Sequence, residues 1–201
     1  MVRHGQTTFN AAGRVQGHSE SPLTELGIAQ AVAVGGALAG RGIRHIYSSD
    51  LVRAARTAEA IGRTLELPVK TDRRLREVCF GDLEGQTWEE LDTYFARAEE
   101  QGRGTWFDVR SPGEGGESRK DLQERAIAAV SDLVSRHPGE TILVVSHGGF
   151  IGFFLRWLLQ LRTSERYVGF RTANCAIHAF DHRAGAFHLV TWGERAHLDG
   201  L

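Results

Sequence analysis

Residues 141–149 read Thr141-Ile142-Leu143-Val144-Val145-Ser146-His147-Gly148-Gly149 and join a continuous apolar run to a histidine and two glycines. A strand that is apolar on both faces is typical of a parallel sheet covered by helices on each side, because neither face meets water. The run therefore predicts a covered strand over 141–146, with His147 directly at its carboxyl end.

Helical and strand-like patterns alternate along the rest of the chain. Capping residues predict helices that begin at or just after Thr24, Asp50, Thr87 and Ser118. Helices are expected over about 25–38, 51–65, 88–101, 119–137 and 150–161, strands over 43–47, 68–71, 175–180 and 186–191, and a loop over 102–116. This alternation predicts an α/β fold, a three-layer α/β/α sandwich with a mostly parallel central sheet.

The composition limits the class of protein. The 201 residues are enough for one domain, and 24 Lys and Arg nearly balance 25 Asp and Glu, so no basic field is available for nucleic acid. Two cysteines are too few for a disulfide framework, which favours a reducing compartment. No signal peptide is visible, and the most apolar segment, 150–161, is too short for a membrane span. We expect a cytoplasmic globular protein.

Two histidines follow strand candidates at the same expected edge of the sheet. His4 stands in Arg3-His4-Gly5-Gln6-Thr7, near the start of the chain, and His147 follows the strand over 141–146. Ligands of such sheets bind beyond the carboxyl ends of strands, so both imidazoles are expected to meet there beside an arginine. This arrangement suits the capture of a phosphoryl group on a histidine nitrogen.

Phosphoryl transfer to histidine needs three kinds of group. The nucleophile is a neutral imidazole whose second nitrogen is held by an acceptor. Arginine forks hold the phosphate oxygens, and an acid protonates the leaving oxygen and later deprotonates water. Either His4 or His147 fits the first role, but spacing alone selects no particular arginine or carboxylate from the 24 basic and 25 acidic residues.

Five ordered blocks that span almost the whole chain resemble the histidine phosphatase superfamily, the phosphoglycerate-mutase-like enzymes. The blocks are Arg3-His4-Gly5-Gln6-Thr7 with Asn10, Ser48-Ser49-Asp50-Leu51-Val52-Arg53-Ala54-Ala55-Arg56-Thr57-Ala58, Leu75-Arg76-Glu77-Val78-Cys79-Phe80-Gly81-Asp82-Leu83-Glu84-Gly85, Gly115-Gly116-Glu117-Ser118 and Ser146-His147-Gly148-Gly149. The resemblance implies the phosphoglycerate-mutase-like version of the α/β/α fold.

The resemblance also implies roles. His4 becomes the nucleophile that carries the phosphoryl group, and Glu77 the proton donor and later the base. Arg3, Arg53 and His147 surround the phosphoryl group as donors. The further substrate contacts that it implies are Asn10, Gln16, Gly17 and Gly148, whose amide opens a helix. The family needs neither metal nor cofactor, so none is expected.

Some residues near these motifs have simpler interpretations. Asp82 and Glu84 compete with Glu77 for the acid role, and Gln16 can equally cap a turn. Arg56 is expected to be an exposed helix charge. The remaining histidines outside the motifs are expected to be surface or satisfied core residues: His18, His45, His137, His182, His188 and His197.

The layout expected from the resemblance is one histidine phosphatase domain over 1–201, with about 86–117 as a helix-and-loop insertion over the active site. The aromatic residues of this insertion either line a pocket or pack onto the core: Trp88, Tyr94, Phe95, Trp106 and Phe107. Family members usually have several apolar residues before the Arg-His pair, but only Met1 and Val2 precede Arg3, so either the first strand is very short or the start of the chain is trimmed or misassigned. A central strand this short is expected to leave neighbouring backbone groups unpaired.

The function expected is that of a phosphatase acting on phosphomonoesters of small metabolites. Only 70 positions (147 − 77) separate Glu77 from His147, and mutases of the family carry a longer, basic insertion there. A phosphoglycerate mutase is the alternative, and a catalytically silent phosphate-binding relative a weaker one. The expected partner is a small phosphorylated metabolite, with no nucleic acid or membrane. The physiological substrate and the oligomeric state stay open, a homodimer being one option.

Overall fold

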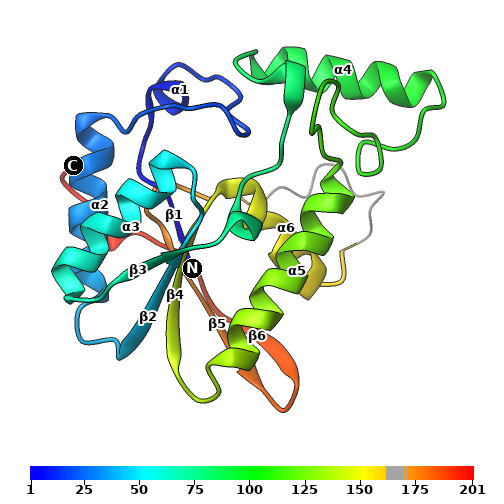
Figure 1. Ribbon diagram of the computed structural model, residues 1–201. Helices are drawn as coiled ribbons and strands as arrows, with labels where there is room; N and C mark the ends of the chain where they lie inside the picture. Colours follow the sequence, from blue (N-terminus) through cyan, green and yellow to red (C-terminus); the bar gives the residue numbers. More distant parts are fainter. Residues whose placement is uncertain (162–169, 171) are drawn as a thin grey trace.

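The computed structural model describes residues 1–161, 170 and 172–201 of the chain. Its described part contains six strands, six α-helices and three short 3-10 helices around one sheet (Figure 1). They are β1 (Val2–Arg3), α1 (Thr8–Ala11), α2 (Glu25–Leu38), β2 (Ile43–Ser48), α3 (Val52–Leu65), β3 (Val69–Thr71), η1 (Arg73–Leu75), η2 (Gly81–Leu83), α4 (Trp88–Glu100), α5 (Arg119–Arg136), β4 (Thr141–Ser146), α6 (Gly148–Leu158), β5 (Ile177–Arg183), β6 (Ala186–Glu194) and η3 (Ala196–Leu198).

The strands of the described part lie in the order β3-β2-β4-β1-β5-β6. The first four are parallel to one another, whereas β5 pairs antiparallel with both β1 and β6. Parallel neighbours need crossover connections, and helices supply them here. The predicted mostly parallel central sheet is confirmed, with an antiparallel hairpin added at one edge.

Helices cover both faces of the sheet, as the apolar run of β4 predicts. Leu143 and Val145 belong to a core with α2 and α3, whereas Val144, between them, belongs to the core formed with α4, α5 and α6 (Figure 1). Successive side chains of a strand point to opposite faces, so one strand contributes to both cores. The three-layer sandwich is therefore confirmed.

The two-residue strand β1 has better hydrogen bonding than its length suggests. The amide of His4 donates to the Ser146 carbonyl at 3.0 Å, and the amide of Cys175 donates to the Arg3 carbonyl at 3.0 Å. On the same side as Cys175, the amide of His178 donates to the Met1 carbonyl at 2.8 Å. The expectation of unpaired neighbours is wrong, because residues flanking β1 continue its pairing with β4 and β5.

Most predicted helix starts are confirmed by side-chain caps. Thr24, Thr87 and Ser118 each accept a hydrogen bond from the backbone of the first turn that follows. The predicted cap at Asp50 is wrong: α3 begins one residue later, after Leu51, with no side-chain cap. Asp50 forms a two-pronged ion pair with Arg76 instead, at 2.6 Å for each contact. An arginine fork outcompetes a backbone amide for this carboxylate.

The apolar segment predicted over 150–161 forms α6, which begins earlier, at Gly148, and ends at Leu158. Its residues Phe150, Ile151 and Phe154 are fully buried. None of the helices in the described ranges is long and apolar enough to cross a membrane.

Candidate active site

The two motif histidines meet at the carboxyl edge of the sheet. His4 directly follows β1 and His147 directly follows β4, and these strands are neighbours. Their ring centroids lie 5.2 Å apart, with the planes tilted by 56°. A cavity of about 1300 Å³ opens at this edge, and its lining includes His4, Arg3, Arg53 and Glu77.

His4 is held as a neutral imidazole with a defined tautomer. Its Nδ1 lies 2.8 Å from the carbonyl oxygen of Gly5, which can only accept, so Nδ1 carries the proton. Burial lowers the pKa of His4 well below its usual value, and the charges of Arg3 and Arg53 lower it further. Nε2 therefore keeps its lone pair, as a nucleophile requires.

His147 is also kept neutral, but its surroundings differ. Burial lowers its pKa well below the usual value, followed by the charge of Arg53. Its Nε2 lies 2.8 Å from the Ser49 hydroxyl, while its buried Nδ1 has no hydrogen-bond partner among the described residues. When the Ser49 hydroxyl donates to Nε2, Nδ1 carries the proton and becomes a donor.

Both motif arginines are anchored through their terminal nitrogens. Arg3 Nη1 donates to the Thr172 carbonyl at 2.6 Å, and Arg53 Nη2 donates to the Gly17 carbonyl at 2.6 Å. Burial lowers the pKa of Arg53 to about 10, which leaves it a cation at neutral pH. The anchors orient each guanidinium without neutralising its charge.

Three buried donor positions around His4 have no hydrogen-bond partner among the described residues. They are Arg3 Nε, Arg53 Nε and His147 Nδ1. A buried donor left unsatisfied costs about 1–3 kcal/mol, so a cluster of them points to a group that supplies acceptors. A tetrahedral oxyanion has enough acceptor oxygens for all three.

Glu77 also lines the cavity, and two backbone amides hold its carboxylate. Oε1 accepts from Val78 N at 3.0 Å and Oε2 from Gly149 N at 2.9 Å. A Cβ on Gly149 would collide with Oε1, so only glycine allows this approach of the helix start to the carboxylate. The first turn of α6 therefore positions Glu77.

Asp82 and Glu84, which compete with Glu77 for the role of acid in the sequence, have different surroundings. Glu84 accepts from the Phe80 amide at 3.1 Å, the His18 amide at 2.8 Å and the Ser19 hydroxyl at 2.6 Å, so it ties two loops together. Neither Glu84 nor Asp82 lines the cavity, whereas Glu77 does. The geometry favours Glu77 for the proton-transfer role.

The other predicted contacts also lie at the cavity. Its lining includes all four of them: Asn10, Gln16, Gly17 and Gly148. Gln16 Oε1 accepts from the Thr7 hydroxyl at 3.0 Å, so Gln16 both lines the cavity and braces the cap of α1. Asn10 Oδ1 accepts from Asn174 Nδ2 at 3.1 Å. The exposed-charge interpretation of Arg56 is confirmed, since it pairs with Glu59 at the surface.

Several residues outside the sequence motifs also support the site. Asn174 also donates to the His4 carbonyl at 2.9 Å, and nothing in its sequence context predicts this. Arg125 donates to the Glu77 carbonyl at 3.1 Å and forms an ion pair with Glu117 at 2.7 Å. His18 Nε2 donates to the same Glu77 carbonyl at 2.8 Å, so the surface-or-core interpretation of His18 is incomplete.

A neutral histidine at a strand end, surrounded by arginine and imidazole donors with a carboxylate nearby, is the arrangement of enzymes that transfer phosphoryl groups through histidine. The chain belongs to the histidine phosphatase superfamily (branch 1), whose family model it matches over residues 1–195.

Individual relatives include enzymes named as mutases and as phosphatases. The "Probable phosphoglycerate mutase GpmB" of Yersinia pestis is 38% identical over 99% of this chain and 94% of its own length. A mycobacterial glucosyl-3-phosphoglycerate phosphatase, in a complex with VO3, superposes with a TM-score of 0.81 at 32% identity, covering 97% of this chain and 98% of its own. A phosphoserine phosphatase mutant from Entamoeba histolytica, in complex with phosphoserine, superposes with a TM-score of 0.82 at 30% identity. The match covers 98% of this chain and 96% of that one.

The buried histidines predict loss of stability in mild acid. Burial lowers the pKa of His178 to about 3, and it lowers the pKa values of His4 and His147 as well. The unfolded chain therefore binds more protons than the folded one below about pH 6.5, and stability falls as pH falls through that value. Each such histidine contributes a slope of about 1.4 kcal/mol per pH unit.

Urea unfolding between about pH 7.5 and 5 measures this slope. His178→Gln keeps an acceptor for the Gly193 amide, which donates to His178 Nδ1 at 3.2 Å, but removes one titrating group. We expect the free energy of unfolding of the variant to fall less steeply with pH than that of the wild type. The difference in slope should be about 1.4 kcal/mol per pH unit, the contribution of one histidine. Equal slopes in both proteins would contradict the assignment.

Proposed function

We propose that the chain is a phosphatase that hydrolyses phosphomonoesters of small metabolites through a phosphohistidine on His4, with Glu77 as proton donor. The observation that carries the proposal is the set of three unpartnered donors, on Arg3, Arg53 and His147, around a neutral His4. Among the described residues, a second, smaller cavity beside α3 and β3 is lined by no histidine or cysteine.

In the first step, His4 Nε2 attacks phosphorus and the bond from phosphorus to the alcohol oxygen breaks. Glu77 gives its proton to that oxygen, so a neutral alcohol leaves and Glu77 becomes a carboxylate. The negative charge on the phosphoryl oxygens is held by Arg3, Arg53 and His147, whose side chains are oriented by their hydrogen bonds before the reaction begins.

In the second step, a water molecule attacks the phosphorus of phosphohistidine. The Glu77 carboxylate takes a proton from the water, the nitrogen–phosphorus bond breaks, and the electron pair returns to His4 Nε2. Inorganic phosphate is then free to leave. Glu77 is protonated again and His4 is neutral again, so the site is ready for another turnover.

Hydrolysis rather than isomerisation is supported by the segment between Glu77 and His147. It contributes α4 and the loop before α5, a smaller insertion than mutases of the family carry, and we infer that 86–117 forms a wall of the active site. Trp88, Asp92 and Trp106 from this segment line the cavity. The mutase alternative is favoured by the 38% identity to the probable mutase.

The leaving group is expected to combine an apolar surface with negative charge. Beyond the phosphate donors, the described lining of the cavity includes six aromatic and three cationic side chains. They are Phe80, Trp88, Trp106, Phe153, Phe170 and Trp192, with Arg119, Arg156 and Arg195. The named ligand of one relative, phosphoserine, carries a carboxylate next to its phosphate ester. The carboxylate of such an ester is a group that the guanidinium groups of these arginines would bind.

The deciding experiment supplies 3-phosphoglycerate with a trace of 2,3-bisphosphoglycerate, in the presence of a metal chelator. We expect inorganic phosphate as the main product, because water reaches the phosphohistidine before a bound glycerate returns to it. Formation of mainly 2-phosphoglycerate would establish the mutase instead. A panel of phosphate esters with and without a carboxylate, compared by kcat/KM, then identifies the leaving group.

A further inference from the structure

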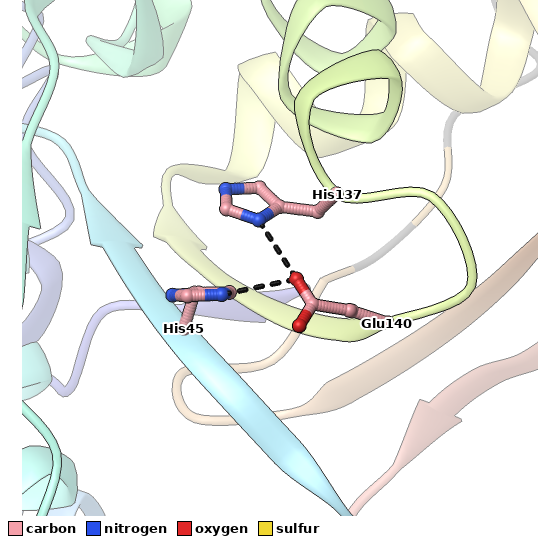
Figure 2. Close-up of side chains that lie close together, drawn as sticks. All are labelled: His45, His137 and Glu140. Carbon is pink, nitrogen blue, oxygen red and sulfur yellow. Dashed lines mark hydrogen bonds and ion pairs between the residues drawn. The ribbon is translucent and has the colours of Figure 1, made fainter.

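A second cluster of titratable side chains lies at the amino end of the sheet, opposite the edge that carries His4 and His147. His45 lies in the first half of β2, His137 directly follows α5, and Glu140 directly precedes β4 (Figure 2). We call His45, His137 and Glu140 the amino-edge cluster. None of its residues lines the catalytic cavity.

The three side chains of the amino-edge cluster converge on one point. Glu140 Oε2 lies 3.1 Å from His45 Nε2 and 3.0 Å from His137 Nδ1, and the three atoms lie within 4.8 Å of one another. Ligand atoms about 2.0–2.2 Å from a zinc ion are about 3.3–3.6 Å apart in a tetrahedron. The two Glu140 contacts are a few tenths of an ångström shorter than this spacing. The two histidine nitrogens, at most 4.8 Å apart, must approach each other by up to about 1.2 Å, which side-chain rotation at partly exposed positions allows.

Two imidazoles and a carboxylate form a ligand set that suits zinc, whereas magnesium prefers oxygen ligands alone. We propose that the amino-edge cluster binds a zinc-type divalent cation through His45 Nε2, His137 Nδ1 and Glu140 Oε2. The side chains of His45 and Glu140 are 30% and 43% exposed, so water can reach the remaining coordination position.

Tyr47 supports the proposal by holding the His137 ring from the other side. Its hydroxyl lies 2.8 Å from His137 Nε2. Without an ion, His137 Nδ1–H donates to Glu140 and the Tyr47 hydroxyl donates to Nε2. With an ion on Nδ1, the proton sits on Nε2 and donates to the Tyr47 oxygen. Metal-bound histidines commonly have such an acceptor on their second nitrogen, which fixes the ring.

The arrangement of donors separates this cluster from an ordinary hydrogen-bonded network. Both histidines direct a nitrogen at the same carboxylate oxygen, Glu140 Oε2, and neither hydrogen bond goes to Glu140 Oε1. An ion that replaces the two shared protons would keep all three side chains in place.

The expected affinity is moderate. Only three protein ligands are available, and the cations Lys70 and Arg136 lie over the Tyr47 ring, 5.7 and 5.5 Å from its centroid. A structural zinc site with four thiolate or imidazole ligands is far tighter than an exposed site with three, so we expect a dissociation constant of about 1 μM. Because the ligands join β2 to the turn between α5 and β4, the bound ion would stabilise the folded chain.

The test measures zinc binding by competition with a chromophoric chelator, together with the melting temperature. We expect one zinc ion at the amino-edge cluster of the wild type, and a dissociation constant raised by about 100-fold or more in His45→Gln and in Glu140→Gln. Tyr47→Phe should raise it about 10-fold, since it removes only the outer partner. The melting temperature of the wild type should rise with zinc but not with magnesium.

Two control variants locate the ion. His188→Ala removes an exposed histidine of β6 that lies outside the cluster, and zinc binding should be unchanged. His4→Ala removes a catalytic-site imidazole, and the zinc ion should again be retained. Loss of the ion in His4→Ala, or undiminished binding in both His45→Gln and Glu140→Gln, would overturn the proposal. The cluster lies away from the cavity, so these outcomes are independent of the phosphatase mechanism.

Discussion

Replacing His4 by alanine is expected to lower kcat/KM for p-nitrophenyl phosphate by at least about 10⁴-fold, because it removes the nucleophile of a covalent mechanism. Alanine also empties a buried position between two arginines, whose charges lower the pKa of His4 in the wild type. Removing that imidazole leaves the charges of Arg3 and Arg53 in place. The variant should therefore still bind an oxyanion while failing to turn it over.

Two measurements make this result specific. Wild type mixed with a labelled phosphomonoester and quenched in alkali should carry an acid-labile phosphoryl group, and His4→Ala should carry none. His188→Ala, at an exposed position, should keep full activity and rules out a general effect of losing an imidazole. A labelled or fully active His4→Ala would mean that another residue is the nucleophile, and an inactive wild type would favour the silent phosphate-binding relative.

The second large effect is expected at Glu77. Glu77→Gln should lower kcat/KM by about 10²–10⁴-fold for alkyl phosphates, since an alkoxide leaves poorly without a proton. The loss should be much smaller in the first step with p-nitrophenyl phosphate, because nitrophenolate leaves without help. Dependence of the loss on the leaving group identifies an acid, which a merely structural role of Glu77 would not produce.

Gly149→Ala provides an independent test of the same residue. A Cβ at Gly149 would collide with Glu77 Oε1 and push the carboxylate from its place beside the first turn of α6. The variant should show the same leaving-group dependence as Glu77→Gln, although its acid is chemically intact. Asp82→Asn, at a carboxylate outside the cavity, is the matched control and should leave the rate unchanged. A loss in Asp82→Asn equal to that in Glu77→Gln would reassign the acid.

Local patterns predicted most secondary structure because their energies depend on neighbours in the chain. Thr87 and Ser118 satisfy backbone amides three residues away, so their caps are visible before the chain is folded. Asp50 failed as a cap because Arg76, 26 positions along the chain, binds its carboxylate more strongly. Competition with a distant partner has no trace in the local sequence.

The same distinction applies to the two histidine groups. The pairing of His4 with His147 follows from two strand ends, and a parallel sheet brings those ends together. The sequence predicts that His45 and His137 are surface or satisfied core residues, because a lone histidine is usually one of these. His137 lies only three residues before Glu140, but the approach of His45 to both depends on the pairing of β2 with β4, which no local pattern describes.

By itself the sequence determined the layered α/β fold and the edge of the sheet at which the two motif histidines meet, and its resemblance to a family pointed to Arg53 and Glu77 as candidates, which line the same cavity. Apolar periodicity and capping are local, and five ordered motifs are long enough to be distinctive. Only the tertiary structure decided the tautomer of His4, the unpartnered donors and the support of Glu77 by Gly149. These depend on contacts between residues far apart in the chain, and packing, not sequence order, brings them within hydrogen-bonding distance.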